Sequence, residues 1–199
     1  MNKNNSALLI FIKNIEKGKV KTRLAATVGD DRALEIYQAL LEHTRKIATA
    51  IDVERYLFYS QFIEENDEWS KEDFQKVVQT DGGLGDKMAA GFQHAFQHHK
   101  KVVIVGSDCA SLTEKIVQDA FDILENKDFV IGPAIDGGYY LIGMRQFFPE
   151  IFQNIEWSTD AVFPDTVGII EGMDKTYGLL PELSDIDYEE DWEKYGWEI

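Results

Sequence analysis

The chain has 199 residues, of which 20 are basic and 36 acidic, so its formal net charge at pH 7 is −16. This charge excludes general binding to nucleic acid or to anionic membrane surfaces, because both need an extended basic face. With 44% hydrophobic residues the chain can bury one sizeable core, and we expect a single domain over residues 1–199.

The first half of the chain predicts three strands and one long helix. The continuous apolar run Ala7–Lys13 is typical of a strand that is covered on both faces. A basic loop, Glu16–Asp31, follows this strand. Apolar residues then recur at helical spacing over Ala33–Ala48, and short apolar runs predict strands at Arg55–Ser60 and Lys76–Thr80.

The second half continues the alternation of helices and strands. The predicted elements are a helix in "GDKMAAGFQHAFQH" (85–98), a strand in "KVVIVGSD" (101–108), a helix over Leu112–Leu124, strands over Phe129–Gly132 and Gly138–Met144, a helix over Thr159–Ile170, a strand over Lys175–Leu180 and an acidic helix in "DYEEDWEKYG" (187–196). Alternating elements predict an α/β fold with a doubly wound, mostly parallel sheet and helices on both faces. Ligands of such sheets bind in the crevice beyond the carboxyl ends of the strands.

The basic loop carries candidates for binding phosphate. We expect Lys13, at the end of the first strand, to converge with Lys19, Lys21 and Arg23 at the carboxyl edge of the sheet. Gly18 lets the backbone approach a ligand closely. This pattern is typical of a diphosphate site, and the alternatives are a solvated basic loop or a loop paired with the acidic tail. The loop lacks the spacing of an ATP-binding P-loop.

The segment "VVIVGSDCASL" (102–112) is an abrupt change from apolar to polar residues. Asp108 directly follows the predicted strand, so it lies at the open end of the sheet, where a carboxylate can hold a divalent cation. Alternatively, Asp108 or Ser107 caps the next helix. Cys109 is a weak candidate for a nucleophile, because no histidine is close to it in sequence.

The segment "GPAIDGGYYLIG" (132–143) permits two interpretations. Gly137 and Gly138 allow a close approach of the backbone to a ligand, and Asp136 can accept hydrogen bonds from sugar hydroxyls. The alternative is a hairpin turn at Asp136–Gly138, with the following tyrosines in the core.

The segment "LSDIDYEEDW" (183–192) is equally ambiguous. Asp185 and Asp187 present two carboxylates that could hold a metal ion. Asp187 and Glu190 also fit a variant of the capping box, in which side chains cap the start of a helix.

Six segments, in this order, resemble the selenodomain-associated, glycosyltransferase-like family of the nucleotide-diphospho-sugar transferase superfamily. They are "KNIEKGKVKTRLAATVG" (13–29), "GGLGDKMAAGF" (82–92), "VVIVGSDCASLT" (102–113), "GPAIDGGYYLIGM" (132–144), "WSTDAV" (157–162) and "LSDIDYEEDW" (183–192). The resemblance covers about Leu8–Trp192 and implies a Rossmann-like fold of the GT-A type.

The resemblance also implies roles for single residues. It places Lys13, Lys21 and Arg23 at phosphates. It places Asp108 on Mg²⁺ or Mn²⁺, with Asp187, or else Asp185, as a second metal ligand. It places "DGGYY" on the sugar or acceptor side, with Asp136 orienting or deprotonating the acceptor. The candidates for catalysis are Asp108 and Asp136; those for binding the nucleotide are Lys13, Gly18, Lys21, Arg23, Gly85, Gly137 and Gly138; those for the metal are Asp108 and Asp187.

The leading hypothesis is a metal-dependent enzyme that transfers a sugar from a nucleoside diphosphate sugar to a small acceptor. The alternatives are a nucleotidyltransferase that releases pyrophosphate, and a nucleotide-binding protein without turnover. The last is motivated by Gly83, Ala110 and Ser111, where family members usually carry Asp, Pro and Asp. We expect a cytoplasmic protein without a membrane span. The sequence does not decide whether the protein forms a homo-oligomer.

Overall fold

The computed structural model describes residues 5–199. The predicted domain, residues 1–199, therefore includes four residues that lie outside the described ones. The strands are β1 (Ser6–Ile12), β2 (Glu54–Tyr59), β3 (Gln75–Val78), β4 (Lys101–Val105), β5 (Phe129–Pro133), β6 (Tyr139–Met144) and β7 (Tyr177–Leu179). The helices are α1 (Thr22–Val28), α2 (Asp30–Ala50), α3 (Leu84–Ala95), α4 (Glu114–Ile123), the 3₁₀ helix η2 (Pro149–Phe152), α5 (Val162–Gly172) and α6 (Glu189–Tyr195).

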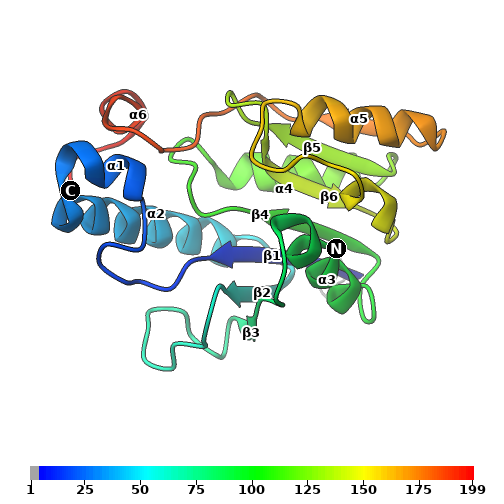
Figure 1. The fold of residues 1–199 in the computed structure, drawn as a ribbon. Coiled ribbons are helices and arrows are strands. Elements are labelled where there is room, and N and C mark those ends of the chain that lie inside the picture. Colours follow the sequence, from blue (N-terminus) through cyan, green and yellow to red (C-terminus); the bar gives the residue numbers. More distant parts are fainter. Residues whose placement is uncertain (1–4) are drawn as a thin grey trace.

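The seven strands form one sheet in the order β3-β2-β1-β4-β6-β5-β7 (Figure 1). The four strands β3, β2, β1 and β4 are parallel, as are β5 and β7, whereas β6 runs antiparallel to both β4 and β5. The predicted Rossmann-like α/β class with a mostly parallel sheet is confirmed. Strand β6 is the exception because a short turn joins it to β5, and only antiparallel neighbours can be joined in this way.

Helices cover both faces of the sheet because successive side chains of a strand point to opposite faces. One buried cluster joins Ile10 of β1 to Leu41 of α2 and Phe121 of α4. A second cluster joins Leu9 of β1 to Phe92 of α3 and to residues of η2 and α5. No helix within residues 5–199 is long and apolar enough to cross a membrane.

Helix α1 lies inside the segment that the sequence predicts as a loop. With seven residues it is too short to show the helical repeat of apolar residues on which such a prediction depends. Its one buried residue, Leu24, packs with Ala33 and Ile36 of α2. Helices α1, α2 and α6 consequently gather beside the carboxyl edge of β1 (Figure 1).

The chain reverses its winding direction at β1. From β1 the chain moves outward to β2 and β3, and it then returns to place β4 on the other side of β1. The carboxyl ends of these four parallel strands meet at one edge of the sheet, and the reversal leaves a crevice between β1 and β4 there. This edge is where the candidate site lies.

Candidate functional site

A cavity of about 410 Å³ opens at the carboxyl edge of the sheet. Its size is in the range of small-molecule sites. Its apolar lining includes Phe11, Leu84, Met88, Ile104 and Ile142, and its polar lining includes Lys13, Ser60, Gln79, Lys87 and Asp108. A mainly apolar wall with a few polar groups suits a ligand that has an aromatic ring and a charged portion.

The end of β1 is held by a tyrosine of helix α2. The Tyr37 hydroxyl donates a hydrogen bond to the Lys13 carbonyl at 2.9 Å and accepts one from the Lys13 N–H at 2.8 Å. Burial and the negative charge of Asp108 raise the pKa of Tyr37, so the hydroxyl stays protonated and can donate. The backbone of Lys13 is therefore fixed, while its side chain remains available to the cavity.

Two amides connect the ends of the neighbouring strands. The buried Asn14 accepts a hydrogen bond from the Ser60 hydroxyl at 3.2 Å and donates one to the Phe62 carbonyl at 2.8 Å. Gln79, just after β3, donates from its amide nitrogen to backbone carbonyls of β1 and β2 at 3.2 and 3.0 Å. These bonds fix the relative positions of the three strand ends at the cavity.

Lys13 and Lys87 are the basic residues that line this cavity. Within residues 5–199, neither has a carboxylate in ion-pair contact. Both lysines, together with Lys19, also line an adjoining cavity of about 250 Å³, but the Lys19 ammonium is paired with Glu16 at 2.9 Å. Two cations without counter-ions in a protein of such negative charge form an attractive site for an anionic ligand.

Lys21 and Arg23 contact predicted metal ligands instead of the cavity. The Lys21 ammonium lies 2.9 Å from the Asp108 carboxylate, and its side chain is only 5% exposed. Arg23 donates a hydrogen bond to the Asp187 carboxylate at 2.8 Å from a more exposed position. The two basic side chains consequently neutralise part of the acidic cluster described next.

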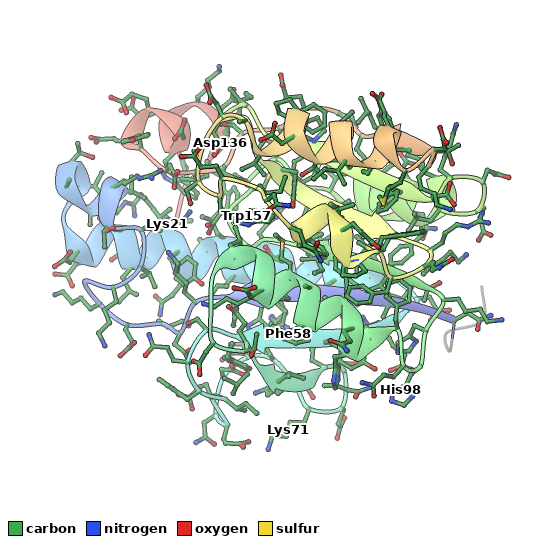
Figure 2. The ribbon with its side chains drawn as sticks, turned by 45° about the vertical axis from the view of Figure 1, so that its right-hand side comes forward. Lys21, Phe58, Lys71, His98, Asp136 and Trp157 are labelled. Atoms are coloured by element: carbon green, nitrogen blue, oxygen red, sulfur yellow. The ribbon has the colours of Figure 1, made fainter. Side chains whose placement is uncertain are left out.

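Four aspartates form an acidic cluster near Lys21: Asp108, Asp136, Asp185 and Asp187. Removal from water and the negative charge of Asp108 raise the pKa of Asp185 to about 7. Lys21 lowers this pKa, whereas Asp136 and Asp187 raise it further. Lys21 and Asp136 lie toward the same side of the molecule, away from His98 (Figure 2).

Neither Asp108 nor Asp187 caps a helix. Thr113 caps α4 by accepting a hydrogen bond from the Ile116 N–H. At α6, Asp191 accepts hydrogen bonds from the N–H groups of Asp187 and Tyr188. The helix-capping role that the sequence allowed for Asp108 and Asp187 is therefore filled by Thr113 and Asp191.

The acidic residues fit a cation that is shared with a ligand. Among residues 5–199 no group of three or more His, Cys, Asp or Glu side chains is arranged to hold a metal ion. Mg²⁺ is commonly bound by one or two carboxylates together with phosphate oxygens of the substrate. Asp108, which lines the cavity, and Asp187, which like Asp108 acts electrostatically on Asp185, could supply such a partial ligand set.

Comparisons with known proteins identify the family. Residues 43–159 match the family described as "Uncharacterized protein conserved in bacteria (DUF2064)". The chain belongs to the DUF2064 family. A solved structure of a predicted nucleotide-diphospho-sugar transferase from Desulfovibrio desulfuricans G20 is 33% identical and has a TM-score of 0.85, covering 92% of this chain and 82% of that one. The relation of this DUF2064 chain to the nucleotide-diphospho-sugar transferase superfamily is thereby confirmed.

Two more distant structures share the fold of the DUF2064 chain. The manganese complex of Rv0371c from Mycobacterium tuberculosis H37Rv has a TM-score of 0.55 and 10% identity over 98% of each chain. The 4-diphosphocytidyl-2C-methyl-D-erythritol synthase from Anaerococcus prevotii DSM 20548 has a TM-score of 0.60 and 9% identity over 98% of this chain and 96% of that one. No curated protein sequence matches the chain.

The structure of the DUF2064 chain brings two of the predicted site residues, Lys13 and Asp108, into the cavity lining. The other candidates lie outside that lining: Gly18, Lys21, Arg23, Gly85, Asp136, Gly137, Gly138 and Asp187. Burial raises the pKa of the Cys109 thiol to about 12, which disfavours a thiolate nucleophile.

Three polar residues of the cavity were missed by the sequence analysis. Ser60 and Gln79 directly follow strands β2 and β3. Their position after a strand is the same signal that pointed to Lys13 and Asp108. Lys87 lies near the start of helix α3, in the glycine-rich segment from which only Gly85 was selected.

Two of the candidate glycines of the DUF2064 chain approach protein atoms closely. A Cβ added to Gly85 would lie 2.6 Å from the Trp157 ring. Gly137 has a φ of +89°, and an added Cβ would lie 2.4 Å from the backbone of Asp160. Gly138 donates a hydrogen bond to the Asp136 carboxylate at 2.9 Å, so the hairpin turn predicted as the alternative is present.

We expect the Gly137→Ala variant to lower the free energy of unfolding by at least about 2 kcal/mol, because alanine is strained at this φ and its Cβ overlaps backbone atoms. Urea denaturation measures the change. Gly168→Ala is the matched control: it lies in helix α5 with no atom near the added Cβ, and should stabilise the protein by about 0.5–1 kcal/mol. Equal stability of the Gly137→Ala variant and the wild type would contradict the packing described here.

Proposed function

We propose that the chain is a metal-dependent transferase that binds a nucleoside diphosphate sugar and passes the sugar to a small acceptor. The observation that carries this proposal is the pair of lysines, Lys13 and Lys87, that line the cavity without a carboxylate partner among residues 5–199. The description of the 33% identical structure as a predicted nucleotide-diphospho-sugar transferase supports it.

In this proposal the two lysines bind the diphosphate, and the apolar wall of the cavity contacts the nucleoside. Asp108 and Asp187 would hold Mg²⁺ or Mn²⁺, which would supply positive charge against the negative charge that develops on the departing diphosphate. Asp136, on the adjacent turn, orients the acceptor hydroxyl or takes its proton. The manganese complex of a structure with the same fold is consistent with such a cation.

Nucleotidyl transfer is the second candidate. The fold is shared with the 4-diphosphocytidyl-2C-methyl-D-erythritol synthase, and the adjoining cavity lined by Lys19 offers room for a third phosphate. The same lysines and carboxylates serve both reactions, because both leave negative charge on a departing phosphate. Release of pyrophosphate from a nucleoside triphosphate would distinguish this reaction from glycosyl transfer.

A thermal-shift panel tests the proposal. Nucleoside diphosphates, triphosphates and nucleotide sugars are compared with and without Mn²⁺ or Mg²⁺. A ligand at about 100 times its dissociation constant adds about 2.7 kcal/mol, which is roughly 5–10 °C for a chain of this size. We expect a metal-dependent shift with one nucleotide sugar.

The Asp108→Asn variant should lose the metal-dependent part of that shift, with affinity about tenfold lower, when each protein is compared with its own ligand-free midpoint. Asp119→Asn is the control, because Asp119 pairs with Lys115 on the exposed side of α4. A shift with triphosphates alone would favour nucleotidyl transfer. Binding without a product over a broad panel of acceptors would leave a nucleotide-binding protein, and no shift with any nucleotide would refute the proposal.

A further inference from the structure

Lys21 joins three segments that are far apart in sequence. Its ammonium donates a hydrogen bond to the Ile186 carbonyl at 2.7 Å and lies 2.9 Å from the Asp108 carboxylate. The Ile186 N–H in turn donates to the Asp108 carbonyl at 2.9 Å. The loop after β1, the end of β4 and the segment before α6 therefore meet at one buried cation.

The burial of this pair is uneven. The Lys21 side chain is 5% exposed, whereas that of Asp108 is 41% exposed and contributes to the cavity lining. The ammonium is thus withdrawn from solvent, while the carboxylate that it neutralises remains accessible. This arrangement differs from that of Lys13 and Lys87, which line the cavity themselves.

The charges around Asp108 explain why an internal cation is needed there. Asp108, Asp136 and Asp187 all act electrostatically on the buried Asp185, and Arg23 is paired with Asp187 at the more exposed side. Without Lys21, the carboxylate of Asp108 would face this negative charge with no adjacent cation and would attract a divalent ion strongly. With Lys21 in place, a divalent ion meets a neighbouring positive charge.

We propose that Lys21 is an internal counter-ion that holds Asp108 and the 185–187 segment together and keeps the affinity for a divalent cation low until a phosphate-bearing ligand is present. The proposal rests on the proposed function for the cation site at Asp108 and for the identity of that ligand. Phosphate oxygens add ligands and negative charge, which offset the repulsion between the ammonium and the incoming cation. Lys21 is in this role a positioning residue and not a phosphate ligand.

The test measures the binding of Mn²⁺ alone, by the electron paramagnetic resonance signal of free Mn²⁺, with no nucleotide in the sample. Wild type should bind Mn²⁺ weakly. Lys21→Met should bind it about tenfold more tightly or better, because the removed charge lies 2.9 Å from the carboxylate. Lys21→Arg keeps the charge and should behave as wild type. The control Lys17→Met removes an exposed pair with Asp31 in the same loop and should change nothing.

If Lys21 only held the three segments together, its removal should not increase the affinity for Mn²⁺. A gain of Mn²⁺ affinity therefore indicates that the charge of Lys21 weakens cation binding. Unchanged or weaker Mn²⁺ binding by folded Lys21→Met would overturn the proposal. If that variant does not fold, wild type still decides: Mn²⁺ binding at micromolar concentrations in the absence of nucleotide, abolished in Asp108→Asn, would also overturn it. Because the Mn²⁺ measurement uses no nucleotide, its outcome does not depend on the outcome of the thermal-shift test of the proposed function.

Discussion

Replacing Lys13 and Lys87 together with methionine should lower the affinity for the bound nucleotide at least about a hundredfold. Each lysine lines the cavity without a carboxylate partner among residues 5–199, so each is available for a charge-assisted hydrogen bond to phosphate. Such a bond contributes about 1.5–3 kcal/mol, and the loss of two corresponds to two or more factors of ten. Methionine keeps most of the aliphatic stem, so the cavity wall is preserved. Isothermal titration calorimetry with the ligand identified by the thermal-shift panel measures the change.

Two controls separate this effect from a general loss of positive charge. Lys115→Met removes a cation that is paired with Asp119 on α4 and should leave the affinity unchanged. Lys19→Met should have a smaller effect than either cavity lysine, because Lys19 is already paired with Glu16. A double variant of Lys13 and Lys87 that binds as tightly as wild type would show that the phosphates bind elsewhere.

The strands that build the carboxyl edge could be predicted from the sequence because they are local features. Strands β1 and β4 are mainly apolar runs, and polar residues that follow them closely, Lys13 and Asp108, reach the cavity. A parallel sheet places such residues at one edge whatever the details of the helices. The fold class and this part of the site thus follow from hydrophobic pattern and strand direction.

The partners of the basic residues could not be predicted in this way. Lys21 and Asp108 are 87 positions apart, and the Ile186 carbonyl that Lys21 also contacts is 165 positions away. No spacing rule connects residues at such separations, since their contact depends on how α6 and the preceding segment pack against α1 and α2. The sequence therefore indicates a basic loop but not which of its cations remain unpaired.

Breaking the buried ion pair between Lys76 and Asp67 should lower the free energy of unfolding by about 3–5 kcal/mol. The Lys76 ammonium lies 2.6 Å from the Asp67 carboxylate, and the two side chains are 4% and 10% exposed. Lys76 also donates to the Glu64 carbonyl at 2.7 Å, and the Tyr59 hydroxyl donates to Asp67. Lys76→Met leaves a buried carboxylate without its cation, which is the costly case. Urea denaturation measures the loss.

The matched control is Lys71→Met in the loop that carries Asp67; Lys71 lies at the outer edge of the molecule (Figure 2) and pairs with Glu65 in an exposed position. This variant should change stability by less than about 1 kcal/mol. A similarly small effect of Lys76→Met would contradict the buried pair. Because Asn14 holds Ser60 independently of Lys76, nucleotide affinity of the folded Lys76→Met protein should stay near that of wild type. If Lys76→Met lowers the stability of the protein but not its affinity for the nucleotide, the Lys76–Asp67 pair stabilises the 60–74 loop and is not needed for the phosphate contacts of Lys13 and Lys87.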